Sequence, residues 1–417
     1  MSLNTSVSGI ITASADLGII GNNIANASTA GFKEARGEFT DIYATASSGG
    51  SSTPVGQGVK LNSVTQNFSQ GNLEFTQSSL DLAINGNGFF RLSDGGVATY
   101  TRAGSFQIDQ DGFLVNGSSM RLQGLPLSED GALDGTLGDI QLNTGLIEPQ
   151  PTSAVSLRVN VDSRVADPLA WDFANLSADM YNHSTSMSIY DSLGNPHVLT
   201  LYFMRDGANN WTARAAIDGE EMAETLNLPF LDSGALNVDP ADAATLRNLT
   251  IAGWTPKDAN GVANGAAAGA DATFTVDLNN VTQFGAEFSV GGVRQDGYAS
   301  GELSGVEIDE NGVLFTRYTN GETRRQSQVV LANFTNPNGL RPVGDTAFVE
   351  GAGSGAPTIT TPGGAGTGTL QSGALEGSNV EITAQLVRMI VAQRNFQANA
   401  QMIQTNDTVT QTVINLR

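Results

Sequence analysis

The two ends of this 417-residue chain restrict its fold more than any other feature. Residues 379–416 contain neither proline nor glycine, the two residues that most readily interrupt a helix. The letters SNVE at its start predict a capping box, with Ser378 as the N-cap and Glu381 reaching back to it. At ~1.5 Å per residue, a helix over this stretch would be roughly 60 Å long. A helix of that length needs close neighbours on several sides.

Both ends carry the apolar spacing of a coiled-coil seam, with alternating steps of three and four residues. Near the start, the large apolar seam positions are Leu3, Val7, Ile10, Leu17 and Ile24, with Ser14 and Gly21 at the other two places. The seam of the last helix comprises Ile382, Leu386, Met389, Gln393, Phe396, Ala400, Ile403, Asp407, Thr410 and Ile414. Because the two segments enclose the rest of the sequence, we expect the two helices to meet.

Both segments are nearly uncharged. Residues 1–32 contain one charge, on Asp16, and the last helix after Glu381 contains only Arg388, Arg394, Asp407 and Arg417. A free-standing coiled coil usually carries Glu and Lys beside its seam. Pairing of the helices within one chain is the simpler interpretation, but burial between subunits explains the neutral flanks better. Contacts between different surfaces of successive copies generate a helical filament, and we expect such ends to be largely disordered before assembly.

The middle of the chain is predicted to be β-structure. Eight Asn-Gly and seven Asp-Gly pairs divide it, and such pairs favour type I′ hairpin turns because both residues tolerate positive φ. Examples are Asp111-Gly112, Asn116-Gly117, Asn311-Gly312 and Asn320-Gly321. β-rich runs such as SMSIYD and HVLTLYFM lie between the turns.

Two further features organise this region. The runs IDQDGFL at 108–114 and IDENGVL at 308–314 are either equivalent hairpins on the two sides of an insertion or a chance match. Gly/Ser/Pro-rich joints at 45–58 and 351–368 separate the β region from the two helical ends, and 259–271 is predicted to be a loop within it.

Composition excludes several classes of protein. The net charge of −22 argues against nucleic acid and equally against anionic membrane surfaces, since both need a basic face. The absence of cysteine excludes disulfides and thiolate metal sites. The first residues lack the pattern of a cleaved signal peptide, and no apolar run approaches the roughly 18 residues of a membrane span. These rules alone indicate a cytoplasmic protein, although a non-classical export route would leave the same pattern.

Catalytic motifs are also absent. The two histidines, His183 and His197, have no carboxylate at metal-ligand spacing, so we expect both to be surface or strand residues. No G-x-S-x-G elbow or P-loop occurs, and the glycines of 351–368 do not form a dinucleotide fingerprint. The DQDG and DENG runs lack calcium-loop spacing and are predicted to be hairpin turns. We therefore expect no catalytic residue, no metal, no cofactor and no enzymatic activity.

At its two ends the sequence resembles the rod and hook family of bacterial flagellar axial proteins. The run NNIANASTAGFK is similar to the family's N-terminal signature at Asn23, Ile24, Ala25, Asn26, Thr29, Gly31, Phe32 and Lys33. Residues 387–407 resemble the C-terminal signature at Gln393, Arg394, Gln397, Ala398, Asn399 and Ala400. Residues 84–116 are similar to a β segment shared by the family, and 187–205 and 318–348 resemble stretches typical of hook proteins, whereas 206–284 match nothing in the pattern.

This resemblance implies an α+β fold, mostly β, with the terminal helices paired in a coiled-coil domain and two nested β-rich domains between them. The implied parts are an inner helical domain of 1–32 and 372–417, a linking region of 33–71 and 363–371, a first β domain of 72–145 and 286–362, and an inserted outer β domain of 146–285. The first β domain would bring the runs at 108–114 and 308–314 together.

The resemblance further implies a structural subunit that polymerises into a curved, hollow tube, a universal joint between rod and filament, outside the cell and exported without a cleaved signal peptide. Its implied partners are further copies of itself, the distal rod, the hook cap, the hook–filament junction proteins and the flagellar export apparatus. A distal rod-type protein is the alternative within the family, and 187–205 and 318–348 count against it. An extracellular adhesin would leave the neutral, amphipathic ends unexplained, and a secreted hydrolase would need a catalytic constellation.

Overall fold

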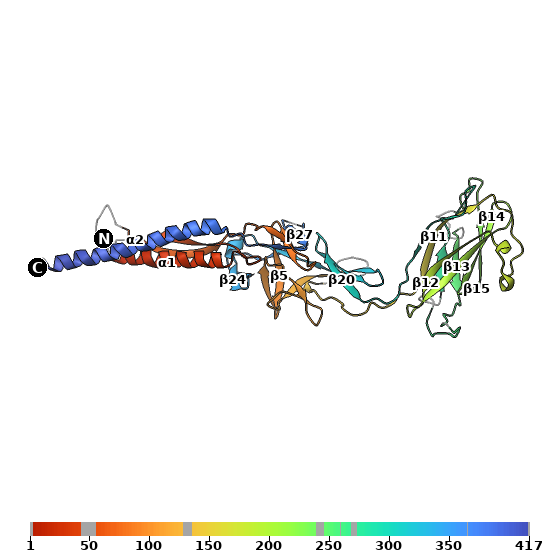
Figure 1. Cartoon of the computed structure of the whole chain (residues 1–417), viewed down its shortest axis with the longest axis horizontal. Helices are drawn as coiled ribbons and strands as arrows, with labels where there is room; N and C mark the ends of the chain where they lie inside the picture. Colours follow the sequence, from red (N-terminus) through yellow and green to blue (C-terminus); the bar gives the residue numbers. More distant parts are fainter. Residues whose placement is uncertain are drawn as a thin grey trace. The chain divides into compact units, whose positions relative to one another are not determined.

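A computed structural model describes residues 3–42, 56–127, 136–238, 246–258, 260–267, 273–364 and 366–415. The joint predicted at 45–58 and the loop predicted at 259–271 lie partly outside these residues. The chain forms two compact units (Figure 1). The first comprises Met1–Asn143, Gly305–Arg317 and Thr323–Arg417, and the second comprises Thr144–Ser304 and Tyr318–Glu322. Most of the described structure is β, and both long helices belong to the first unit, so the fold is α+β as the sequence predicts.

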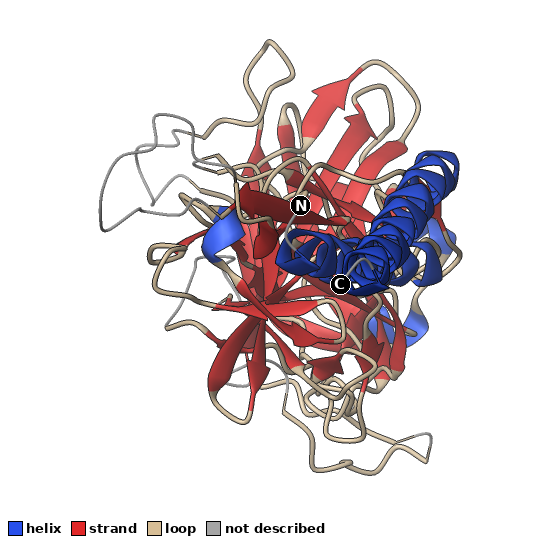
Figure 2. Ribbon diagram, turned by 90° about the vertical axis from the view of Figure 1, so that its left-hand side faces the viewer, coloured by secondary structure: helices blue, strands red, loops and turns tan. Residues whose placement is uncertain are grey.

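Two antiparallel helices lie side by side in the first unit, α1 over Leu3–Ala25 and α2 over Ile382–Asn415 (Figures 1 and 2). The prediction that α2 begins at 379 with Ser378 as its cap is wrong by three residues. The side chain of Asn379 is used elsewhere: its Oδ1 accepts from the Glu34 amide at 2.7 Å, and its Nδ2 donates to the Asn67 carbonyl at 2.7 Å. The helical hydrogen bonds therefore begin after Glu381, whose carbonyl accepts from the Gln385 amide at 3.0 Å.

The first helix, α1, is long and apolar enough to cross a membrane by length and composition alone, which the sequence-based expectation of no such run missed. In the structure it packs between α2 and a two-stranded ribbon of β1 (Ala35–Asp41) and β2 (Val59–Gln66). Its polar residues Ser6, Thr12 and Asn23 are buried in these contacts. Burial of polar groups that find hydrogen-bond partners is typical of protein packing rather than of exposure to lipid.

Strands from early and late in the sequence pair beside the helices, which explains the nested order of the chain. Strand β3 (Leu73–Phe75) pairs with β28 (Ala374–Glu376), and β4 (Leu82–Asn85) pairs with β27 (Thr369–Ser372). Both pairs are antiparallel. The C-terminal segment is thus fixed to the N-terminal segment by backbone ladders just before α2 begins.

The largest sheet of the first unit is buried on both faces at its strand β5. On β5 the consecutive residues Phe89 and Phe90 both lie buried but in different clusters, because successive side chains of a strand point to opposite faces. The strands of this sheet are β5 (Phe89–Asp94), β6 (Val97–Thr101), β7 (Gln107–Ile108), β8 (Leu114–Val115), β9 (Arg121–Pro126), β10 (Gly138–Asp139), β20 (Leu303–Ile308), β21 (Val313–Tyr318), β22 (Thr323–Val329), β23 (Leu331–Asn333), β24 (Arg341–Gly344), β25 (Ala347–Val349) and β26 (Thr358–Thr360). A 3₁₀ turn at Pro337–Gly339 precedes β24.

The glycine-containing turns differ from the predicted type I′ geometry, which needs positive φ at both central residues. Only the glycine has positive φ at Asp111-Gly112, Asn311-Gly312 and Asn320-Gly321, and neither residue does at Asn116-Gly117. The type I′ prediction is therefore wrong at these four turns. It fits Asp218-Gly219, where φ is 50° and 82°.

The runs at 108–114 and 308–314 are equivalent hairpins in the first unit. The Oδ1 atom of Asp109 accepts hydrogen bonds from two backbone amides of its own turn at 2.9 and 2.7 Å. Asp309 does the same at 2.9 and 2.8 Å. A glutamine outside each turn completes the match: Gln141 donates to a carbonyl of the first turn at 2.9 Å and Gln328 to one of the second at 2.8 Å.

The second unit contains two sheets that share one apolar core. Along β11 every second residue from Val155 to Val161 is buried, the alternation expected of a strand with one covered face. One sheet comprises β11 (Ala154–Asp162), β16 (Asn248–Ala252), β17 (Thr273–Asp277), β18 (Thr282–Phe284) and β19 (Ser289–Gln295). The other comprises β12 (His183–Tyr190), β13 (Pro196–Arg205), β14 (Asn210–Ile217) and β15 (Glu220–Pro229), and 3₁₀ turns lie at Phe173–Asn175 and Ala178–Met180.

Candidate assembly interface

The two helices meet through a face of mostly small and amide side chains. Among the residues of the helix pair whose burial the structure describes, Thr12 is buried together with Ser6, Ala13, Ile20, Asn23, Gln385 and Ala392. At Gly9 the approach is so close that an added Cβ would lie 2.4 Å from Oδ1 of Asn399. Small side chains permit such a short distance between helix axes. These six buried positions each lie one residue before a position of the predicted seam.

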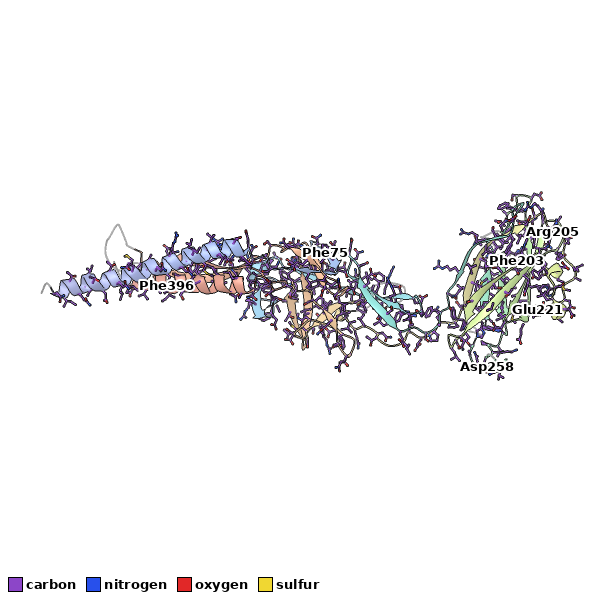
Figure 3. All side chains as sticks on the ribbon, in the orientation of Figure 1. Phe75, Phe203, Arg205, Glu221, Asp258 and Phe396 are labelled. Atoms are coloured by element: carbon purple, nitrogen blue, oxygen red, sulfur yellow. The ribbon has the colours of Figure 1, made fainter. Side chains whose placement is uncertain are left out.

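The predicted seam residues form two sets in this chain. Ile10, Leu17, Ile24, Met389 and Ile403 are partly buried beside the helix contact, and Phe396, labelled in Figure 3, is 37% exposed. The exposed set comprises Leu3, Val7, Ile382, Leu386 and Ile414. Further exposed apolar residues of the pair are Ile11, Val387, Ile390, Val391 and Val409. Exposed apolar surface of this extent on one helix pair is typical of an interaction site.

The signature residues Asn23 and Asn26 bond within their own chain. Asn23 is buried, and its carboxamide pairs with the backbone of Ala35: Nδ2 donates to the carbonyl at 2.8 Å, and Oδ1 accepts from the amide at 2.9 Å. The same Nδ2 lies 3.4 Å from Oε1 of Gln385 on α2. Asn26 donates to the Asn22 carbonyl at 3.0 Å and so closes the last turn of α1. One asparagine thus joins α1, β1 and α2.

Gly31 is required at a close backbone crossing. Its φ is +71°, and a Cβ added there would lie 2.3 Å from the amide nitrogen of Ala103. Its own amide donates to the carbonyl of Glu376 at 2.7 Å. Since α1 ends at Ala25, Gly31 is not the stop signal of that helix; it allows the chain to pass against the β region.

A buried ion cluster holds this crossing together. Lys33 comes from the N-terminal signature, Arg102 from the turn after β6 and Glu376 from the end of β28, and all three are buried. The Lys33 ammonium lies 2.5 Å from Oε1 of Glu376, and the Arg102 guanidinium lies 3.0 Å from Oε2. The lysine also donates to the Ser69 carbonyl at 2.8 Å, and the arginine to the Gly86 carbonyl at 2.9 Å. One carboxylate therefore serves two cations from separate parts of the chain.

Burial dominates the electrostatics of the cluster. It lowers the pKa of the Lys33 ammonium below its usual range, and the Glu376 carboxylate opposes this shift. Burial lowers the pKa of the Arg102 guanidinium in the same way, again opposed by Glu376. Because buried cations are costly unless they are paired, both depend on this one carboxylate.

The remaining signature residues have different surroundings. Phe32 is partly buried, Asn399 packs against Gly9, and Gln393 and Arg394 are exposed on α2. Glu376 and Arg102 were missed by the sequence reasoning. The available signal was the isolation of Glu376, an acidic residue inside the otherwise neutral run TLQSGALEGSNV.

The two histidines of the second unit have different surroundings. His183 on β12 is partly buried and stacks on Phe288, with ring centroids 4.5 Å apart. His197 on β13 is buried, 2.6 Å from Oδ2 of Asp218 and 3.3 Å from Oδ2 of Asp191. Both histidines are therefore strand residues, as expected, and His197 in addition lies beside two carboxylates. Over the part of the chain that the structure describes, no group of three or more His, Asp or Glu residues is arranged to hold a metal ion.

Alanine at Gly31 and alanine at Gly18 are predicted to change the stability of the first unit in opposite directions. Gly31→Ala should destabilise the first unit by about 1–3 kcal/mol, because alanine is strained at positive φ and its Cβ would displace the backbone of Ala103. Gly18→Ala, inside α1 with nothing within 4 Å of the added Cβ, should stabilise it by about 0.5–1 kcal/mol. Urea unfolding followed by circular dichroism measures both. Equal effects of the two substitutions would show that the Gly31 crossing imposes no constraint.

Comparison with known families matches four flagellar domains to this chain. They are "Flagella basal body rod protein" over residues 3–33, "Flagellar hook protein FlgE/F/G D1 domain" over 83–166, "Flagellar basal body protein FlaE D2 domain" over 160–298 and "Flagellar basal body rod FlgEFG protein C-terminal" over 371–416. The matches to both ends coincide with the paired helices and the signature residues. Together with the fold, they define an axial protein of the bacterial flagellum.

Full-length relatives narrow this class. The chain is 37% identical over 429 residues to the flagellar hook protein FlgE of Escherichia coli (strain K12), covering 100% of both chains. It is 36% identical to that of Salmonella typhimurium, again over 100% of both chains. A crystal structure of Helicobacter pylori flagellar hook protein FlgE2 aligns with 73% of this chain and 100% of its own, at 15% identity and a TM-score of 0.49. The chain belongs to the flagellar hook protein family.

Proposed function

We propose that this chain is a structural subunit of the flagellar hook that polymerises into a curved, hollow helical tube. The tube acts as a universal joint that transmits torque from rod to filament. One observation carries the proposal: a nearly uncharged helix pair leaves large apolar side chains such as Leu386 and Ile382 about half exposed in the single chain, at 45% and 50%. Burial of such a surface is the main favourable term in subunit association.

The helix pair and the β-rich parts would have different mechanical roles in the tube. The exposed seam residues would pack between neighbouring copies and hold the inner tube. The acidic, polar β surfaces would touch through wet contacts, which re-register more readily than dry cores. A tube built in this way resists twist and bends easily. Few fixed charges on the helices would also suit a channel through which unfolded subunits pass.

The remaining parts of the proposal follow from family resemblance. The inner domain would comprise 1–32 and 372–417, the link 33–71 and 363–371, the first β domain 72–145 and 286–362, and the outer domain 146–285. The partners would be other copies, the distal rod, the hook cap, the junction proteins and the export apparatus. The subunit would act outside the cell, reach that place without a cleaved signal peptide, and have no enzymatic activity. The full-length relatives favour the hook over the distal rod alternative.

Circular dichroism on polymerisation tests the proposal. The last turns of α2, residues 407–415, have every described side chain exposed in the single chain, and a helical segment without tertiary packing is only marginally stable. We therefore expect the signal at 222 nm to show a gain of helix when subunits assemble. An adhesin or a hydrolase would show full helix content as a monomer. Unchanged helix content in assembled protein would contradict the coupling of helix formation to assembly.

A further inference from the structure

The end of α2 runs past its partner helix. Because Gly9 lies opposite Asn399 in the antiparallel pair, the start of α1 at Leu3 lies near Thr405. Figure 1 shows α2 continuing beyond α1 at this end. All side chains described in residues 407–415 are exposed. We call this segment the α2 tail.

The exposed surface of the α2 tail is suited to burial against another protein surface, because few of its side chains need contact with water. The hydroxyls of Thr408, Thr410 and Thr412 each donate to the carbonyl four residues earlier, at 2.9, 2.8 and 2.8 Å. A threonine bonded in this way needs no water and presents its methyl group. Val409 and Ile414 add larger apolar side chains that are 55% and 65% exposed. Only Asp407 is charged in this segment.

A groove lies at the opposite end of the same helix pair. It holds about 360 Å³ between the end of α1, the start of α2 and β1. Its apolar lining includes Ile19, Phe39, Val387 and Val391. The groove is continuous with the helix contact, since Asn23 and Gln385, which are hydrogen-bonded across that contact, also line it.

We propose that the α2 tail of one copy docks in this groove on a second copy. The inference rests on the proposed function, which supplies the second copy. The charges are complementary: Arg36 and Arg388 line the groove against the single acid Asp16, and the tail carries Asp407. Arg388 also pairs with Glu34 of its own chain, so Arg36 is the freer cation.

Tail and groove are different surfaces, so the contact is heterologous and repeats head to tail. A heterologous contact that does not close on itself generates a helical polymer. The α2 tail extends beyond its own copy and packs on the next copy. The apolar seam of α2 in one copy then continues along the α1–α2 seam of the next copy. Each added subunit then exposes a new tail or a new groove.

Disulfide trapping tests the contact, because the natural chain has no cysteine. Full-length Val409→Cys is mixed with full-length Val391→Cys, the mixture is polymerised, oxidised and separated on a non-reducing gel. Both valines are at least half exposed in the single chain, so neither change should disturb folding. We expect a dimer that contains one of each variant. Val387→Cys provides a second groove position, and a short bismaleimide covers Cα distances beyond the 4.4–6.8 Å range of a disulfide.

Matched controls separate the possible outcomes. Val409→Cys alone should give no dimer, and Val409→Cys mixed with Val198→Cys, an exposed valine of the second unit, should give none either. Tubes that contain no tail–groove dimer with either groove position would overturn the inference and leave the proposed function intact. The same holds for tubes in which Val409→Cys links to itself. Failure of the unmodified chain to polymerise would overturn both.

Discussion

Replacement of Leu386 by aspartate should abolish polymerisation and leave both compact units folded. Leu386 is 45% exposed near the start of α2, so the carboxylate of a single chain would remain in water. In the assembled tube the same carboxylate would be buried without a partner, at a cost of roughly 3–5 kcal/mol. That cost weakens each subunit addition by a factor of at least about one hundred. Electron microscopy and sedimentation measure the loss of tubes.

A control distinguishes a specific helix contact from a general effect of added charge. Val198→Asp makes the same type of change at a residue that is 50% exposed on β13 of the second unit. We expect tubes from this variant. Unchanged circular dichroism and tryptophan fluorescence of the Leu386→Asp monomer would show that its units are folded. Normal tubes from Leu386→Asp would rule out the predicted seam.

Glu376→Gln should destabilise the first unit by about 3–5 kcal/mol, because it leaves the buried cations of Lys33 and Arg102 without their carboxylate. Two probes separate the units. Both long helices belong to the first unit, so circular dichroism at 222 nm reports mainly on that unit. The three tryptophans, Trp171, Trp211 and Trp254, all lie in the second. Denaturant unfolding should therefore shift at 222 nm and remain unchanged by fluorescence.

Glu74→Gln is the matched control for this prediction. Glu74 is exposed on β3, the strand that pairs with the one carrying Glu376. We expect its substitution to change the free energy of unfolding by less than about 0.5 kcal/mol. Equal stability of the Glu376→Gln and Glu74→Gln proteins would contradict the role assigned to the ion cluster.

The helix pair could be predicted from the sequence, but its contact face only in part. Periodicity identifies where large apolar residues recur, and Leu3, Val7 and Leu386 occupy positions of that three- and four-residue spacing. Within the chain, the helices approach through Gly9 and Ala13 instead, since small side chains allow closer axes. A periodic pattern cannot tell a face that packs in its own chain from one left free for another copy.

The positions of the turns could be predicted from the sequence, but their backbone geometry could not. Asp-Gly and Asn-Gly pairs were expected to set the turn themselves. At 108–114 and 308–314 the turn is instead organised by Asp109 and Asp309, which accept two backbone amides each. An aspartate that satisfies amides in its own turn allows a geometry in which only glycine needs positive φ.

The ion cluster could not have been derived from spacing. Lys33 and Glu376 are 343 positions apart, and no periodicity links residues that meet only through tertiary pairing. The isolation of Glu376 in a neutral stretch gave a signal without a partner. The structure supplies the partner, because β28, which pairs with β3, carries Glu376 to the crossing at Gly31.

The most direct test of the account is electron microscopy of the purified, unmodified chain after concentration in a sulfate buffer, which strengthens the burial of apolar surface. We expect hollow, helical tubes built from this chain alone. Protein that stays monomeric under these conditions, or forms only closed or amorphous aggregates, would contradict it.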